Sequence, residues 1–239
     1  MKKILTILLV LTMIFTFSAC SVSGIVKGLT GGALDVGSNM KWPKDKMGSV
    51  PELKGAKINS ILNLNEGTSL VFTDLSTKDA EAYYKKLKDV SKDISIMGKD
   101  ENNKIWFTGY INNAEVVFFC YDGSGTLATS VKEYEKYTYQ IFYGDEAKWD
   151  NKALKNIPEL KNIIVTVMTI NDDSVSIMFN NTDVNNVKKY IDTLKSSGFS
   201  EDFSSEYDNG FMFSGSKGDI SVFITYNSDS TDFGSITVN

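Results

Sequence analysis

The side chains that most often carry out acid–base and nucleophilic chemistry are scarce in this chain. Histidine, the commonest general base and zinc ligand, is absent from the 239 residues. All 25 basic residues are lysine, so no guanidinium can hold a carboxylate or phosphate through two hydrogen bonds. Cys120 lies in the apolar run 116–121, which is typical of a buried strand, and no histidine is present to activate its thiol. The serines include no Gly-x-Ser-x-Gly nucleophile motif. We therefore expect no catalytic residues, and a binding role rather than an enzymatic one.

The 30 acidic residues leave two chemical alternatives open. Two carboxylates facing each other across a groove would suit a hydrolase, although no spacing singles out a pair. The oxygen-rich segments 171–173 and 227–232 suggest calcium binding. Neither has the loop length, the glycine and the terminal Glu of an EF-hand, and both fall where hairpin turns are expected. We expect no metal and no other cofactor.

Tyrosine is distributed unevenly along the chain, with eight residues between positions 83 and 143 and three after position 189. Tyr137, Tyr139 and Tyr143 share one face of an expected strand at 137–143, because side chains alternate along a strand with a period of two. We predict that these three tyrosines bind a peptide or glycan through contact area rather than charge. The alternative is that their rings pack against the second half of the chain across the connection 145–148.

The chain matches itself when it is shifted by 107 residues. The shift places Trp42 on Trp149, Pro51 on Pro158, Glu52 on Glu159, Leu53 on Leu160, Lys54 on Lys161, Phe72 on Phe179, Tyr83 on Tyr190, Leu87 on Leu194 and Lys88 on Lys195. After the expected helix the register slips by one or two residues, within turns rich in Asn and Gly, where a strand is not disturbed. The self-match predicts two copies of one unit, at 42–145 and 146–239.

Each copy has the same expected elements. Apolar alternation predicts a first strand at 56–64 and at 163–169, and turn residues lead to a second strand at 70–72 and at 175–179. A helix follows, capped by Ser76 in the first copy and by Thr182 or Asp183 in the second. Further strands are expected at 104–110, 115–121 and 137–143, and at 210–215, 220–226 and 235–238. The predicted fold class is α+β: two tandem repeats, each an antiparallel β-sheet with one α-helix packed on one face.

The N-terminus has the features of a secretory signal: two lysines, an apolar run at 4–17 and small residues before Cys20. The run is short for a membrane span. The stretch 17–20, Phe-Ser-Ala-Cys, resembles a bacterial lipobox. This resemblance implies a signal peptide at 1–19, cleavage before Cys20, and acyl chains on the Cys20 thiol. An ordinary signal peptide is the alternative.

The segment 20–41 would then hold the lipidated cysteine and a flexible, glycine-rich tether, with a short docked helix as the alternative. Without Lys2 and Lys3, 23 lysines remain against 30 acidic residues, a net charge of −7. An acidic chain argues against nucleic acid as a partner. We expect a protein anchored to the cell membrane by its acyl chains and facing outside the cytoplasm.

A further resemblance rests on the motifs of each copy: Trp, then Pro-Glu-Leu, a hairpin, a helix ending in Tyr-x-x-x-Leu-Lys-x-x-Gly-Phe at 190–199, and an aromatic and glycine-containing strand pair. Together they resemble a domain of unknown function found in secreted lipoproteins of Gram-positive bacteria. The first copy lacks the Gly-Phe ending, so the second resembles the family more fully. The family implies a fold and no established activity. We expect a non-catalytic lipoprotein that binds an envelope protein, peptide or glycan; a hydrolase, or an inhibitor-like or structural module, are the alternatives.

Overall fold

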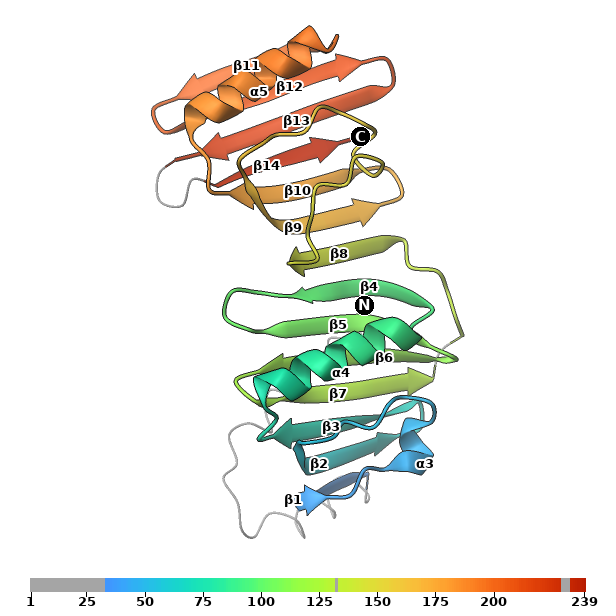
Figure 1. Cartoon of the computed structure of the whole chain (residues 1–239). Helices are drawn as coiled ribbons and strands as arrows, with labels where there is room; N and C mark the ends of the chain where they lie inside the picture. The colour runs from blue at the N-terminus through green and yellow to red at the C-terminus, as the bar shows by residue number, and fades with distance from the viewer. Residues whose placement is uncertain (1–32, 132, 229–232) are drawn as a thin grey trace.

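The structure, a computed structural model, describes residues 33–131, 133–228 and 233–239. The strands of this part form one mixed sheet of 14 strands, seen as a long twisted ribbon in Figure 1. The strands are β1 Leu34–Met40, β2 Lys57–Leu64, β3 Gly67–Thr73, β4 Asp93–Lys99, β5 Ile105–Ile111, β6 Ala114–Tyr121, β7 Ser124–Val131, β8 Tyr139–Gly144, β9 Ile164–Asn171, β10 Val175–Asn180, β11 Ser200–Tyr207, β12 Gly210–Lys217, β13 Ile220–Asn227 and β14 Phe233–Val238. The described helices are α3 Lys44–Met47, α4 Thr77–Val90 and α5 Val184–Ser196.

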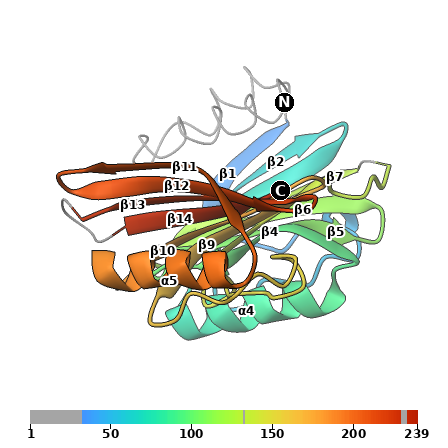
Figure 2. The ribbon, with the colours of Figure 1, turned by 90° about the horizontal axis from the view of Figure 1, so that it is seen from above.

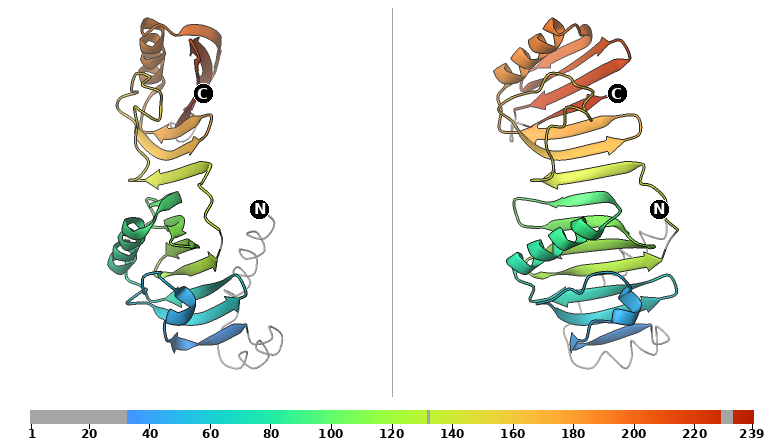
Figure 3. Two further views of the ribbon diagram at one scale, coloured as in Figure 1. Left: turned by 90° about the vertical axis from the view of Figure 1, so that its right-hand side faces the viewer. Right: turned by 45° about the vertical axis from the view of Figure 1, so that its right-hand side comes forward.

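The order of the strands in space repeats itself. The first series of strands is β1-β2-β3-β7-β6-β5-β4. The second series, β8-β9-β10-β14-β13-β12-β11, continues the same sheet. Every neighbouring pair is antiparallel except β4 and β8, which run parallel where the two series meet (Figure 3). The prediction of antiparallel strands with a helix on one face is confirmed. The predicted sheets are not separate, because β8 joins them into one.

Both long helices lie on the same face of the sheet (Figure 2). The Ser76 hydroxyl accepts a hydrogen bond from the backbone N–H of Asp79 at the start of α4. The Asp183 carboxylate accepts one from the backbone N–H of Asn186 at the start of α5. Helix α5 ends at Ser196 and is followed by Ser197 and Gly198, whose φ of +97° suits a glycine just after a helix end. Each helix covers one of two apolar clusters that lie between it and the sheet. None of the described helices is long and apolar enough to cross a bilayer.

A buried tyrosine joins each long helix to the segment that leads into β2 or β9. The Tyr83 hydroxyl in α4 donates to the Pro51 carbonyl oxygen at 2.8 Å, and the Tyr190 hydroxyl in α5 donates to the Pro158 carbonyl oxygen at 2.9 Å. Both pairs are related by the 107-residue shift. Each proline lies in the segment that leads into β2 or β9, and its carbonyl oxygen accepts the hydrogen bond from the helix tyrosine.

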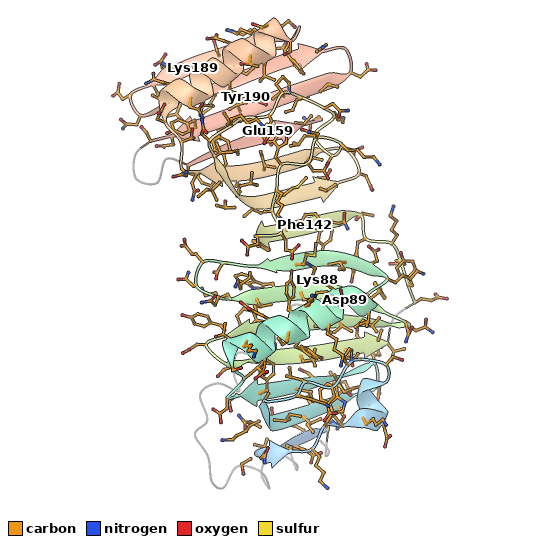
Figure 4. The ribbon with its side chains drawn as sticks, viewed as in Figure 1. Lys88, Asp89, Phe142, Glu159, Lys189 and Tyr190 are labelled. Carbon is orange, nitrogen blue, oxygen red and sulfur yellow. The ribbon has the colours of Figure 1, made fainter. Side chains whose placement is uncertain are left out.

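The two series are also joined beside β8 (Figure 4). Phe142 of β8 packs against the apolar cluster beneath α5. Glu146, just after β8, accepts a hydrogen bond from Lys88 of α4, and the Tyr84 hydroxyl reaches the same carboxylate oxygen at 3.3 Å. Apolar packing towards one series and polar bonds towards the other hold β8 between them.

Four strands fall outside the expected ones. The predicted flexible tether, 20–41, is wrong for Leu34–Met40, which form β1 and pair with β2. Residues 20–32, with Cys20, lie outside the described residues. Strands β4, β7 and β11 were also missed, because they are held by backbone pairing rather than by a clear apolar alternation: every residue of β11 is exposed. The last strand expected in the first copy, 137–143, is β8 at 139–144 and pairs with β9 of the second series. In the first series the place of β14 is taken by β7, which pairs with β3.

Candidate binding surface

The sheet face opposite α4 and α5, called the open face here, carries a continuous row of cross-strand neighbours. Trp106 in β5 alternates with Ile105 and Phe107, which belong to the cluster beneath α4, so its side chain lies on the open face. Successive partners in this row, from β7 to β9, are Thr126, Phe119, Trp106, Gly98, Tyr143 and Val167. The backbone register therefore aligns three aromatic rings across the junction of the two series.

These three rings, Phe119, Trp106 and Tyr143, form the aromatic patch. The ring centroids of Trp106 and Phe119 are 6.0 Å apart, and those of Trp106 and Tyr143 are 5.3 Å apart. Both distances are typical of interacting aromatic pairs. All three side chains are partly exposed. The patch is thus a partly exposed surface of three contacting, mutually tilted rings.

Gly98 makes the contact between Trp106 and Tyr143 possible. It stands between them in β4 and contributes no side chain, so the two rings meet across the strand. Its φ is +151°, and a Cβ atom at this position would lie 2.5 Å from the Cβ atom and the carbonyl oxygen of Tyr143. Only glycine fits without displacing β8.

The three tyrosines predicted to bind a ligand are placed differently from one another. Tyr139 and Tyr143 lie four residues apart on one face of β8; Tyr139 is 46% exposed and Tyr143 belongs to the aromatic patch. Tyr137 precedes β8, so the prediction that all three belong to one strand is wrong for this residue. Its hydroxyl donates to Glu115 at 2.9 Å, and its ring packs 5.3 Å from that of Tyr110. A ligand-binding role for the three stays a prediction.

Tyr137 belongs to a segment, 133–138, that covers one end of the open face. Beneath it, Tyr110 is fully buried against the rings of Tyr134 and Tyr137. Asp93 accepts hydrogen bonds from the Tyr134 hydroxyl and the Tyr137 amide, both at 3.2 Å. Burial, and then the neighbouring Glu115 carboxylate, raise the pKa of the Tyr137 hydroxyl. The expected packing of these tyrosines against the second half does not describe Tyr137, which packs on β4 to β6 of its own half.

Trp106 and Phe119 were not selected from the sequence. Trp106 is the one tryptophan of the three without a counterpart under the 107-residue shift. A residue present in one copy only is not explained by the fold that both copies share. The uneven distribution between the two copies, which singled out the tyrosines, therefore also marks Trp106 as a candidate binding residue. Phe119 carries no comparable signal, because it sits inside an apolar run.

The other candidate sites have structural explanations. Cys120 is 3% exposed, and burial raises the pKa of its thiol. The groove that a hydrolase would need between the halves is occupied by β8, which pairs with β4 and β9. The Asn171 side chain accepts hydrogen bonds from the amides of Asp173 and Ser174, which closes a hairpin turn. Residues 229–232 of the second calcium candidate lie outside the described residues, and the described ones include no cluster of three Cys, Asp or Glu side chains placed to hold a metal ion.

Comparison of the chain with protein-family models, curated proteins and solved structures gives no match. The resemblances to a lipobox and to a lipoprotein domain family therefore stay predictions that rest on the motifs quoted for them.

Proposed function

We propose that this protein is a membrane-anchored, extracytoplasmic lipoprotein that holds an envelope glycan on its aromatic patch without catalysing a reaction. The observation that carries the proposal is the row of contacting rings Phe119, Trp106 and Tyr143 on the open face, opposite α4 and α5. Flat aromatic rings contact the C–H faces of sugars over a large area at little entropic cost, since their side chains have few rotatable bonds.

The surroundings of the patch suit a neutral, hydroxyl-rich polymer. Thr126 is the cross-strand neighbour of Phe119, and Thr108 and Thr169 lie in the adjacent row on the same face. Threonine hydroxyls both donate and accept hydrogen bonds. The three rings lie on strands that span three inter-strand spacings, or roughly 14 Å, so a polymer running across the strands would contact all of them.

The two series of strands support a proposal of tandem repeats in which the site lies at one place only, on β5 and β6 of the first series and on β8 at the junction. They share one strand order, one helix placement and the tyrosine-to-proline hydrogen bond. By cross-strand position, Met212 and Thr225 stand in the second series where Trp106 and Phe119 stand in the first. The shared fold does not need these aromatic residues, and this favours a role in binding.

Replacing Trp106 with alanine is expected to weaken glycan binding at least tenfold, or about 1.4 kcal/mol, because it removes the central ring. The measurement is co-sedimentation with insoluble envelope glycan over a range of protein concentrations. Met212→Ala is the matched control, since it truncates the equivalent position of the second series and should bind as the parent does.

Circular dichroism and thermal unfolding of both variants establish that the fold is retained. If folded W106A binds glycan as strongly as M212A, the patch is not the binding site. If the parent instead retains envelope peptides and not glycan, the ligand class in the proposal is wrong.

Replacing Cys20 with serine is expected to move the protein from the membrane fraction to the soluble extracytoplasmic fraction, because acyl chains cannot be attached to serine by the same route. The apolar contribution of two or more acyl chains is what makes such anchoring stable. The measurement is fractionation with detection of the protein, with Cys120→Ser as the control for loss of a cysteine. Retention of C20S in the membrane would contradict the lipid anchor.

A further inference from the structure

Strand β11 forms one end of the sheet, and every residue in it is exposed (Figure 1). In the described part of the chain, no strand pairs with its outer side. The backbone N–H and C=O groups on the outer side of an end strand can pair with an added strand. The outer side of β11, called the β11 edge here, is therefore available to another chain in the folded protein.

The fold already contains a strand added to the equivalent edge of the first series. Strand β4 corresponds to β11, because each pairs antiparallel with the next strand and has a bulge near its start. Lys99 of β4 forms an ion pair with Glu81 of α4 at 2.5 Å. A shift of 107 residues leads to Glu206 of β11 and Lys188 of α5, which form a pair at 2.5 Å with the charges exchanged. The outer side of β4 is occupied by β8, so this position in the fold accepts a further strand.

The charges of β11 indicate what kind of chain fits beside it. The strand β4 carries one aspartate and one lysine. The strand β11 and the turn after it carry four carboxylates and no lysine: Glu201, Asp202, Glu206 and Asp208. Glu201 and Glu206 form ion pairs with lysines of α5. Among the described residues, Asp202 and Asp208 have no lysine partner, so negative charge remains at both ends of β11.

This charge pattern favours a basic chain over a second copy of β11. Two β11 strands side by side would bring their carboxylates together, and like charges on neighbouring strands destabilise a sheet. A lysine near each end of an added strand would instead lie close to Asp202 and Asp208, which is the complementary arrangement.

Apolar side chains lie beside the β11 edge on the open face. The Glu206 side chain faces α5, so Ser205 and, two residues earlier, Phe203 lie on the opposite face of the strand. Phe203 is 50% exposed, and Met212, the cross-strand neighbour of Ser205 in β12, is 39% exposed. An added strand places alternate side chains on this face, where large apolar groups would bury the exposed surface of Phe203 and Met212.

We infer that the β11 edge binds an extended peptide as an additional strand of the sheet. The peptide has apolar or aromatic side chains at alternate positions and a lysine near each end. Backbone hydrogen bonds to β11 supply affinity, and the side chains on the open face and the two lysines supply selectivity. The edge lies at the far end of the second series from the aromatic patch. Peptide binding therefore does not rest on glycan binding, and failure of one proposal leaves the other standing.

The first test asks whether binding occurs through strand pairing. The probe is a fluorescent peptide, Lys-Ile-Thr-Tyr-Thr-Lys with both ends blocked, and the measurement is fluorescence anisotropy with the full-length protein in non-ionic detergent. Two further peptides carry N-methyl groups on alternate backbone amides, one on the odd and one on the even positions. Backbone amides of a strand point alternately to its two sides. One methylated peptide is therefore expected to bind as the unmodified peptide does, and the other at least about tenfold more weakly.

The second test places the peptide at the edge. Phe203→Ala is expected to weaken binding about tenfold, because it removes the apolar neighbour of the added strand. Phe223→Ala is the matched control: Phe223 is 40% exposed and alternates with the buried Val222 and Ile224, so it lies on the same open face, but β13 is an interior strand. The F223A protein should bind the peptide as the parent does. Circular dichroism of both variants establishes that the fold is retained.

The third test concerns charge. The double variant Asp202→Asn, Asp208→Asn is expected to bind the peptide about tenfold more weakly. The double variant Asp172→Asn, Asp173→Asn is its control, because it removes two carboxylates from the exposed turn between β9 and β10 and should leave binding unchanged.

Four results would overturn the inference. Equal binding of the two methylated peptides would exclude strand pairing. Equal losses in F203A and F223A would place the peptide on the sheet face rather than at its edge, and unchanged binding when glutamate replaces both peptide lysines would exclude the charge complementarity. In sedimentation, a parent dimer that dissociates in F203A would mean that a second copy of the chain occupies the β11 edge.

Discussion

Replacing Gly98 with alanine is expected to lower the free energy of unfolding by about 3 kcal/mol. The residue has a φ of +151°, which L-amino acids rarely adopt, and a Cβ atom would lie 2.5 Å from the Cβ atom and the carbonyl oxygen of Tyr143. The strand β8 must therefore move away from β4, which weakens the parallel hydrogen bonds that join the two series. Urea denaturation followed by circular dichroism measures the change.

The matched control is Ser205→Ala, at the equivalent position of β11. No strand of the described chain lies outside β11, and Ser205 is exposed, so we expect a change within about 0.5 kcal/mol. Similar effects of G98A and S205A would mean that the close packing of β4 and β8 does not contribute to stability. A second readout is the fluorescence of Trp106, which should change in G98A because its contact with Tyr143 is loosened.

Alkaline pH is expected to destabilise the protein through two buried tyrosines. Burial raises the pKa of the Tyr83 and Tyr190 hydroxyls above the ordinary value of 10.0. The raised values mean that the folded state keeps these protons when the unfolded state has lost them. The resulting stability is fully present below pH 10 and is lost as the pH rises from 10 towards the folded-state pKa. At pH 11.5 the loss is about 2 kcal/mol for each tyrosine, or about 4 kcal/mol for both.

The measurement is the free energy of unfolding in urea at intervals between pH 8 and pH 11.5. The double variant Tyr83→Phe, Tyr190→Phe lacks both titrating groups, so its stability should fall by about 4 kcal/mol less than that of the parent over this range. At pH 8 the same variant should be less stable by about 1 kcal/mol for each lost hydrogen bond to Pro51 or Pro158. Parallel pH profiles for the parent and the variant would contradict this explanation.

The elements that could be predicted from the sequence are those with their own local signals. Ser76 and Asp183 identified the starts of α4 and α5, because an N-cap side chain and an apolar stripe act within a few residues. The strands β2, β3, β5, β6, β9, β10, β12, β13 and β14 have either alternating apolar residues or a short apolar run, and each contributes side chains to the clusters beneath the helices. The 107-residue shift predicted the correspondence between halves, and the repeated strand order agrees with it.

What the sequence did not predict depends on distant backbone pairing. Strand β11 has no buried residue and is held by its hydrogen bonds to β12, so no apolar pattern marks it. Strand β8 was assigned to the first half, because its neighbours β4 and β9 are distant in the sequence and the chain between them gives no sign of the pairing. The same limit applies to the candidate site. Tyr143 was selected, whereas Trp106 and Phe119 join it only through the register of four strands.

The parallel junction also sets the timing of events while the chain is being synthesised. Strand β8 ends at Gly144, 45 residues after β4 ends at Lys99. At the usual rate of 5–20 residues per second, β4 waits roughly 2–9 s for the strand that pairs with its outer edge. During that interval β4 is an open edge on a nascent chain, and neighbouring nascent chains on one messenger present the same edge. Rapid synthesis of the segment from the end of β4 to the end of β8 would shorten the exposure, so the yield of folded protein should depend on how quickly that stretch is translated.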